Sequence, residues 1–528
     1  MDALLRDTLF GRFVNYISND KYFSRPDSEW QNWEKYVQVK LPSVATSEEH
    51  AGEKTSAPVP ERILDFSGPD DPAIPRNWSS GVKALVAMNV MFLNFGFYSA
   101  SAIFTPSMED IEKKFNGTTA EGTLGLSLFV IAYGIGPLIL SPLSNLPSVG
   151  RTPVYVFGCL AFCLFNIGTA VAKNLQTVLV LRFLGGFIGS APISIGGASL
   201  MEIYNPAEIG YAIALYAVSG VCGPILGPLL GTAVNLRWNT WRASVWLIMG
   251  ITAFTTIFTF FFLPETLSTN ILLRRARRIR AKTGDQSCKT QTELAAPENE
   301  FFKSLFKQTI NDFRLSCVDP VVIFVNLDTM LVYGILYLWF EFFPYVFNGI
   351  YHFTSLQQSL AYFGILVGAF ISVVCYMLWL YFVYIPKTRD LDNPVEPEAR
   401  LRPGQVGAVC IPICLFIFAW TSRESVHWIV PIIGTAFFAP GFYLTFQSIL
   451  NYLGESYPRH AASVFAGNTF FRSSFGGALP LAAPRMLDSL GIGWASSVLG
   501  FISVAMLPFP FILERYGKRL RSWSPYAN

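Results

Sequence analysis

Residues 178–192, VLVLRFLGGFIGSAP, decide the class of fold to which this chain belongs. They lie inside an apolar run, 176–200, that holds one permanent charge, the guanidinium of Arg182. A helix of about 20 apolar residues is long enough to cross the hydrocarbon core of a bilayer. We therefore expect a transmembrane helix here, with a cation inside it.

Further runs of this kind occur along the 528 residues, of which 52% are hydrophobic and 14% charged. Such a composition excludes an ordinary soluble protein. We predict an all-α membrane protein with twelve transmembrane helices, at 82–104, 122–145, 153–172, 176–200, 209–233, 243–263, 319–345, 357–384, 405–421, 427–452, 462–484 and 492–514.

The longest internal polar segment, residues 264–318, divides these spans six and six. An equal division indicates two six-helix bundles with a substrate path between them. This segment contains the basic tract ILLRRARRIRAKTGD, and the C-terminus carries ERYGKRLRSW. The positive-inside rule then places both termini in the cytosol. We predict a cytosolic tail at 1–81, bundles at 82–263 and 319–514, a basic cytosolic loop between them, and a second tail at 515–528.

Two explanations fit the charge of Arg182. A central membrane arginine costs about 2.5 to 3.5 kcal/mol, so it usually faces a cavity or a partner. Alternatively, its long side chain reaches the outer interface, which lies about two helical turns away. Gly185, Gly186 and Gly189 follow it and let another helix approach closely. We favour the cavity.

The seventh predicted span carries two acids, Asp328 and Glu341, and two tyrosines on one helical face, Tyr333 and Tyr337. A carboxyl group in a low dielectric holds a proton more readily than it does in water. Either acid is therefore a candidate proton carrier, and the alternative is a buried acid that only forms hydrogen bonds. The tyrosines are candidate substrate contacts.

Other polar groups occur in the tenth and eleventh spans. Arg472 lies well inside the eleventh span, with Asn468 one turn before it, and Gln447 and Asn451 are one turn apart in the tenth. These groups suit a pocket for large amphipathic molecules, although hydrogen bonds between helices would use them equally well.

The fifth span contains the repeat GPILGP, in which Pro224 and Pro228 follow Gly223 and Gly227, with Gly220 before them. Prolines remove backbone donors and bend a helix, whereas glycines open close contacts on one face. We predict a bend in this span; simple packing is the alternative.

No phosphate-binding loop of the Walker type and no metal-ligand spacing occur in the sequence. We expect no cofactor, no metal and no nucleic-acid partner. An ion gradient is the remaining energy source, since one proton moving down 100 mV releases about 2.3 kcal/mol.

Together these motifs resemble, over nearly the whole chain, fungal multidrug exporters of the twelve-span drug:proton antiporter branch of the major facilitator superfamily. The matching pieces are GPDDP and NWS before the first span, SLFVIAYGIGPLILSPLS, the GR at 150–151, LRFLGGF and GVCGPILGP. LPET with its basic tract, YLWFEFFP, SVFAGNTFFRSSF and YGKRLR follow in order.

The resemblance implies proton-driven efflux of drug-like molecules. It places Arg182 at the proton-coupling arginine and the fifth-span glycines and Pro224 in the antiporter signature. Gly150 and Arg151 match the end of the gating loop. The chain departs from the family at Asn145, where relatives carry an acid, so Arg151 needs another partner, and Glu202 is available.

We therefore expect a monomeric, multi-pass plasma-membrane antiporter that exports amphipathic drugs, xenobiotics or fungal metabolites in exchange for protons, with Asp328 as the first candidate partner of Arg182. Two alternatives remain: a nutrient or polyamine uptake transporter of the same fold, and a membrane sensor or scaffold that transports nothing. An enzyme is not expected, because no catalytic constellation gathers at one membrane depth.

Overall fold

The computed structural model describes residues 2–18, 22–23, 33–40, 61–205, 208–295, 310, 313–388, 396–457 and 461–524. By length and composition, eleven helices in these residues are able to cross a membrane. The last, Val464–Arg521, has 58 residues, or about 87 Å at the α-helical rise. It is interrupted at Gly491, where φ is 67°. Because a bilayer core is only about 30 Å thick, this element supplies two crossings, which brings the total to the twelve expected.

Each predicted span falls on a helix. The first half contains α4 (Ser80–Ala102), α6 (Thr119–Ser144), α7 (Arg151–Ala170), α8 (Leu175–Gly189) followed by α9 (Ala191–Ile203), α10 (Ile209–Trp238) and α11 (Arg242–Phe262). The second half contains α15 (Pro320–Phe343), α16 (Ser355–Ala361) with α17 (Phe363–Trp379), α19 (Arg402–Thr421), α20 (Ile429–Ala436) with α21 (Phe438–Ser456), α22 (Ala461–Met506) and α23 (Pro508–Arg521).

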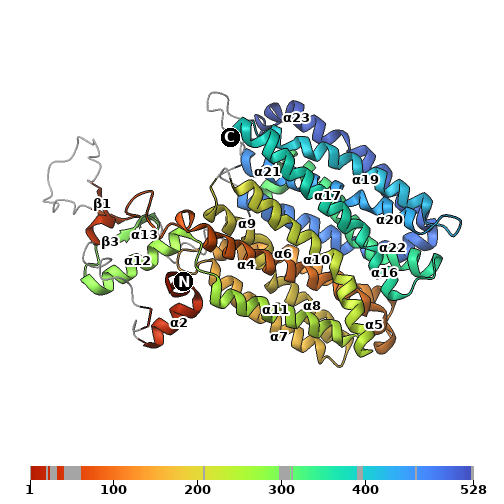
Figure 1. Cartoon of the computed structure of the whole chain (residues 1–528), viewed down its shortest axis with the longest axis horizontal. Helices are drawn as coiled ribbons and strands as arrows, with labels where there is room; N and C mark the ends of the chain where they lie inside the picture. The colour runs from red at the N-terminus through yellow and green to blue at the C-terminus, as the bar shows by residue number, and fades with distance from the viewer. Residues whose placement is uncertain are drawn as a thin grey trace.

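The helices pack as two groups side by side (Figure 1). In the first group α4 packs on α10 and α11, and α6 packs on α8; in the second, α15 packs on α22 and α19 on α21. The two groups meet where α6 contacts α22 and where α10 contacts α17. The all-α architecture of two bundles with a shared interface is therefore the expected one.

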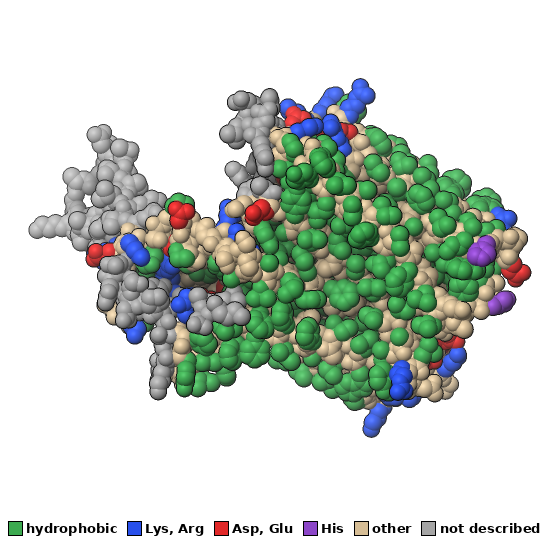
Figure 2. Space-filling view, in the orientation of Figure 1, with side chains coloured by type: hydrophobic (Ala, Val, Ile, Leu, Met, Phe, Trp, Pro, Cys, Tyr) green, Lys and Arg blue, Asp and Glu red, His purple; other side chains and the backbone are tan. Residues whose placement is uncertain are grey.

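Hydrophobic side chains cover the flank of the bundles, whereas charged side chains gather at the two ends (Figure 2). This distribution is the one that a bilayer requires, because charged groups stay in water and apolar groups face lipid. Both chain ends lie at the same end of the helices, at the left in Figure 1. We call this the terminal end and the other the far end.

A small sheet at the terminal end joins the N-terminal tail to the central loop. β1 (Val37–Lys40) pairs antiparallel with β2 (Glu61–Leu64), and β2 pairs parallel with β3 (Cys288–Thr290). The helix α12 (Ser268–Thr283), which holds the basic tract, precedes β3 and packs on it. The tail and the loop, which the sequence presented as separate polar segments, thus fold together.

A buried ion pair fastens this unit. Arg275 of α12 donates hydrogen bonds of 2.8 and 3.3 Å to the carboxylate of Asp71 and lies 4.3 Å from the ring centre of Tyr36. Burial alone would raise the pKa of Asp71. Hydrogen bonds from Arg275 and from the backbone of Ser67 and Ala73 outweigh burial and lower the pKa to about 2. The GPDDP segment therefore has a structural partner in the basic tract.

Candidate functional site

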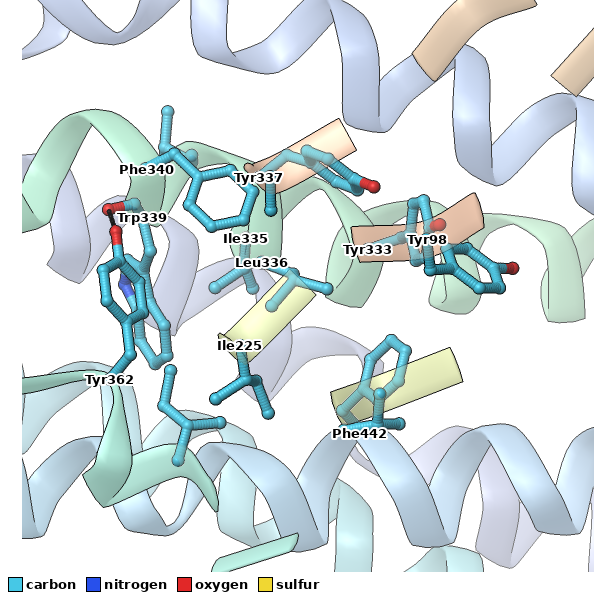
Figure 3. Close-up of a cluster of buried hydrophobic side chains, with 14 of the residues drawn as sticks. Tyr98, Ile225, Tyr333, Ile335, Leu336, Tyr337, Trp339, Phe340, Tyr362 and Phe442 are labelled. Carbon is cyan, nitrogen blue, oxygen red and sulfur yellow. Dashed lines mark hydrogen bonds between the residues drawn. The ribbon is translucent and has the colours of Figure 1, made fainter. Parts of the chain in front are cut away.

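Buried tyrosines connect the two bundles near the middle of the helices. The Tyr133 hydroxyl of α6 lies 2.5 Å from the Tyr333 hydroxyl and 2.9 Å from the Tyr337 hydroxyl, both on α15. Ser101 of α4 lies 3.1 Å from the Tyr337 hydroxyl. Figure 3 shows Tyr98 of α4 beside Tyr333. The expected pair on α15 thus meets partners from the first bundle.

Arg472 lies at the edge of these tyrosines. Its Nη2 donates a 3.2 Å hydrogen bond to the Tyr98 hydroxyl, and its guanidinium lies 4.8 Å from the ring centre of Tyr333 and 4.9 Å from that of Phe446. Arg472 is only 4% exposed. Among the described residues no carboxylate pairs with it, and its Nε has no hydrogen-bond partner. Phenol and π-electron groups thus hold this buried cation, and one donor stays available. We call Tyr98, Ser101, Tyr133, Tyr333, Tyr337 and Arg472 the tyrosine–arginine cluster.

A polar ladder continues from the cluster toward the terminal end. Asn468, one turn before Arg472, donates hydrogen bonds of 3.0 Å to the Asn326 side-chain oxygen and 2.7 Å to the Thr329 hydroxyl. These contacts lie between α15 and α22 of the same bundle. Asn468 therefore fixes the helix that carries Arg472, rather than lining the cluster.

The other predicted substrate residues lie elsewhere. Asn451 of α21 donates a 3.3 Å hydrogen bond to the Tyr376 hydroxyl of α17 and a 2.7 Å hydrogen bond to the backbone oxygen of Gln447. The buried side chain of Gln447 interacts with the same Tyr376 hydroxyl. The predicted set of substrate residues is thus divided between the cluster, the ladder and this second polar group.

Arg182 is buried between α4, α6 and α8, at 2% exposure. Its Nε donates a 3.1 Å hydrogen bond to the Gly125 carbonyl, and its Nη1 a 3.2 Å hydrogen bond to the Ala100 carbonyl. The guanidinium lies 4.1 Å from the ring centre of Phe129 and 4.3 Å from that of Phe104. The side chain is therefore packed inside the first bundle, against two backbone carbonyls and two phenyl rings.

No carboxylate contacts Arg182 within the described part of the chain. Asp328, the expected partner, is five residues from Tyr333 and nine from Tyr337, so it lies about 140° and about 180° around α15 from them. It therefore faces away from the first bundle. Its Oδ2 is buried and has no hydrogen-bond partner among the residues that the structure describes. The structure brings Asp328 neither to Arg182 nor to the cluster.

Glu341 instead faces the first bundle, one turn beyond Tyr337. Its carboxylate accepts a 3.0 Å hydrogen bond from the Thr123 hydroxyl of α6. Thr123 is two residues from Gly125, whose carbonyl holds Arg182. The same stretch of α6 therefore touches both the buried cation and this acid.

The glycines of the fifth span form the contact surface between α10 and α4. A Cβ on Gly223 would lie 2.8 Å from the Ser99 nitrogen, and one on Gly227 2.6 Å from the Ala102 Cβ. Gly220 packs on Tyr98 in the same way. α10 continues as one helix through Pro224 and Pro228. The close contact is thus present, and the bend stays a prediction.

The loop between α6 and α7, which the resemblance identifies as the gating loop, lies at the terminal end of the first bundle. Arg151 lies 3.5 Å from a carboxylate oxygen of Glu202 and 3.5 Å from the side-chain oxygen of Asn145. Arg151 thus contacts both side chains, and Glu202 supplies the negative charge that Asn145 lacks.

A second acid, Glu265 of the LPET segment, completes this loop. Its carboxylate accepts hydrogen bonds from the backbone of Arg151, at 3.0 Å, and Thr152, at 3.3 Å. These amides begin α7, whose preceding residue, Gly150, has no side chain to cap them. A Cβ at Gly150 would lie 2.4 Å from the Glu265 carboxylate. Sequence reasoning missed Glu265, for which LPET was the only signal.

Hydrogen bonds between the bundles concentrate toward the far end. There Thr123 contacts Glu341, and the Thr232 hydroxyl of α10 lies 2.8 Å from the Ser359 hydroxyl of α16. In the half nearer the termini, the corresponding bond among described residues is a 3.1 Å contact from the Tyr443 hydroxyl to the Ala214 carbonyl. More of the hydrogen bonds between the bundles therefore lie at the far end than in the half nearer the termini.

Comparisons with known proteins agree with this architecture. The chain is 40% identical to the transporter mfs1 of Schizosaccharomyces pombe, with 99% of each chain covered. It is 39% identical to the multidrug transporter FLR1 of Candida glabrata, over 88% of this chain and 83% of that protein.

The fold also occurs among solved structures. A partially occluded inward-open structure of the xylose transporter XylE from E. coli superposes with a TM-score of 0.58 at 14% sequence identity, covering 83% of this chain and 98% of the other. At this identity the likeness concerns the fold alone. Residues 90–480 match the Major Facilitator Superfamily. This chain of two helical bundles therefore belongs to the Major Facilitator Superfamily.

Proposed function

We propose that this protein exports amphipathic drug-like molecules, xenobiotics or fungal metabolites in exchange for protons. The observation that carries the proposal is the tyrosine–arginine cluster, a buried aromatic and hydrogen-bonding site on the interface of two bundles. A site at this position is exposed alternately to the two sides when one bundle rocks against the other. The relatedness to a protein named a multidrug transporter supports drugs as substrates.

The cluster suits neutral molecules that have an aromatic ring and a hydrogen-bond acceptor. Tyr98, Tyr333 and Phe442 offer ring faces, and Phe442 stacks on Tyr333 with the ring centres 6.2 Å apart. The unpartnered Nε of Arg472 offers a donor. A substrate acceptor that binds this donor is favoured, because a buried donor without a partner costs about 1 to 3 kcal/mol. A neutral azole has both features, whereas a permanently cationic dye would face the charge of Arg472.

Glu341 is the carboxylate that we propose to carry the proton. It is joined to α6 beside the Gly125 carbonyl, which holds Arg182. Protonation of Glu341 removes the charge that accepts the Thr123 hydrogen bond, and so weakens one of the bonds between the bundles at the far end. The positive charge of Arg182 then opposes the binding of the proton to Glu341. Asp328 faces the interior of its own bundle and takes no part in this exchange.

We further propose that the protein works as a monomer in the plasma membrane, with both termini in the cytosol. The basic residues of α12 and α23 at the terminal end support this orientation. The larger share of hydrogen bonds between the bundles at the far end supports a conformation that is closed toward the outside. Drug would then enter from the cytosolic side before the bundles rock.

The test uses a fungal strain that lacks its own drug pumps. Cells expressing the chain are loaded with fluconazole, a neutral azole, and efflux is followed before and after the proton gradient is collapsed. Export should stop on collapse. An uptake carrier would instead release the loaded azole down its gradient, and a sensor without transport would give the efflux of cells that lack the chain.

Glu341→Gln and Asp328→Asn separate the two candidate acids in the same strain. We expect Glu341→Gln to abolish gradient-driven efflux while exchange of labelled for unlabelled azole continues, because exchange needs no net proton transfer. Asp328→Asn should keep gradient-driven efflux per protein at the membrane. The opposite pattern would assign the proton to Asp328.

A further inference from the structure

The helix α2 (Leu9–Ser18) presents an apolar face that no described residue covers. Phe13, Tyr16 and Ile17 are 58%, 83% and 66% exposed. Their spacing of three and four places them on one side of the helix. Tyr22, just beyond the helix, is also exposed. A soluble surface rarely gathers large apolar side chains in this way, so the face calls for a partner.

Phe10, which lies on the same side of α2 as Phe13 and Ile17, fixes the position of the helix against α11. The Phe10 ring centre lies 4.7 Å from that of Phe261 and 6.0 Å from that of Phe260. Thr8, just before α2, pairs with Pro264, which follows α11. Because α11 is a membrane-spanning helix that ends at Phe262, α2 lies at the level where α11 leaves the bilayer.

The lipid-facing stripe of α11 leads directly to this contact. Phe254 and Ile257 are exposed on α11, and Phe261 follows them at helical spacing on the same side. Phe261 is the residue that Phe10 covers. The exposed face of α2 therefore continues the surface that α11 presents to lipid.

We infer that α2 lies in the plane of the membrane, with Phe13, Tyr16 and Ile17 inserted into the leaflet on the side of the termini. A short helix with one aromatic and aliphatic face is typical of elements that lie at the headgroup level of a bilayer. Phe23 is held against α2, because the Asn15 side chain accepts a 3.1 Å hydrogen bond from its backbone nitrogen and donates a 3.0 Å hydrogen bond to its backbone oxygen. The N-terminal tail is thereby anchored to lipid.

The test uses the full-length protein in nanodiscs of phosphatidylcholine and phosphatidylserine. A phosphatidylcholine with a diazirine near its headgroup labels lipid-exposed side chains, and hydroxyl radicals label water-exposed ones. Mass spectrometry then locates both labels. We expect residues 9–23 to carry the lipid label, and Tyr16 to be oxidised at least tenfold more slowly than in a denatured sample.

The variant Phe13→Asp, Tyr16→Asp, Ile17→Asp should lose the lipid label in residues 9–23 and keep it in residues 254–261 of α11. Lys289→Asp, on the exposed side of β3, is the control and should change neither label. Rapid oxidation of Tyr16 in nanodiscs would overturn the inference. Protection from both labels would also overturn it, since a second copy or another segment of the chain would then cover the face.

Discussion

The hydroxyl oxygens of Tyr133 in α6 and Tyr333 in α15 lie 2.5 Å apart, so a direct hydrogen bond joins the two bundles near the middle of both helices. Tyr133 also reaches Tyr337, at 2.9 Å. A transporter that rocks its bundles must break and remake these contacts in each cycle, and their strength therefore helps to set the balance between its conformations.

Tyr133→Phe should shift that balance toward the state that is open at the far end. Losing two buried hydrogen bonds of about 1 kcal/mol each changes the ratio of the two states by roughly tenfold or more. Hydrogen–deuterium exchange should then rise around Thr123 and Glu341, at the far ends of α6 and α15.

Tyr155→Phe is the matched control for this substitution. Tyr155 is buried and its hydroxyl lies 3.1 Å from that of Ser199, but both residues belong to the first bundle. We expect no increase in exchange at the far end. An equal increase in both variants would mean that Tyr133 only stabilises its own bundle.

Arg182→Ala should abolish proton-coupled efflux while the protein remains folded in the membrane. The guanidinium is the charge between α4, α6 and α8, and the Ala100 and Gly125 carbonyls that it contacts already belong to helices. Efflux of fluconazole per protein at the membrane measures the effect.

Arg242→Ala provides the comparison. Arg242 also donates to two backbone carbonyls, those of Ala170 at 2.7 Å and Ala172 at 3.0 Å. Its loss should lower stability by about 1 to 3 kcal/mol and leave coupled efflux per protein intact. Normal efflux in Arg182→Ala would refute the coupling role.

Gly227→Val should separate α10 from α4. Its Cβ would lie 2.6 Å from the Ala102 Cβ and 2.9 Å from the Ile103 nitrogen. Forcing atoms into such a contact costs about 1 to 3 kcal/mol, so the thermal unfolding midpoint of the purified protein should fall and transport should weaken. Gly250→Ala is the control, because a Cβ there meets nothing within 4 Å. An unchanged midpoint in Gly227→Val would show that the close contact is not required.

The twelve crossings and the burial of Arg182 could be predicted from sequence, because both follow from the cost of placing polar groups in hydrocarbon. The residues that contact each other across the two bundles could not be predicted in this way. Tyr98 and Tyr133 are single tyrosines in apolar runs with no distinctive spacing, and their partner Tyr333 is 200 residues or more away along the chain. Only the packing of α6 and α4 against α15 brings them together.

The assignment of Asp328 to Arg182 shows the same limit. The depth of a residue along a membrane helix can be estimated from sequence. The direction in which its side chain points depends on how the helices pack, and Asp328 lies on the opposite side of α15 from the tyrosines. The sheet at the terminal end was missed for a related reason: its strands have four, four and three residues, and β3 lies more than 200 residues after β2.

Asp71→Asn should weaken the packing of the N-terminal tail on the central loop at neutral pH. The folded pKa of Asp71, about 2, lies below the ordinary value, so its charge stabilises the fold above about pH 4 and this contribution is lost as the pH falls toward 2. The difference between the folded and the ordinary pKa of Asp71 corresponds to about 2 kcal/mol of stability. Protease cleavage within residues 61–79 should therefore be faster in the variant at pH 7.

The pH dependence gives this prediction its control. The difference in thermal stability between wild type and Asp71→Asn should narrow as the pH falls from about 4 to 2. Glu396→Gln removes an exposed carboxylate that pairs with Lys518 at 3.1 Å and should change cleavage little, because exposed pairs contribute little. Equal cleavage of wild type and Asp71→Asn would contradict the structural role of the buried pair.

We propose that an opposing proton gradient drives drug movement through the tyrosine–arginine cluster. The most direct measurement uses the purified protein in sealed vesicles with a pH-sensitive dye inside and fluconazole added outside, at an imposed pH difference. We predict that protons leave an acidic interior as azole accumulates, that neither flux occurs without the other, and that Arg472→Met abolishes both. Azole accumulation that proceeds at equal pH on both sides, or in Arg472→Met at the wild-type rate, would contradict proton-driven transport through this cluster.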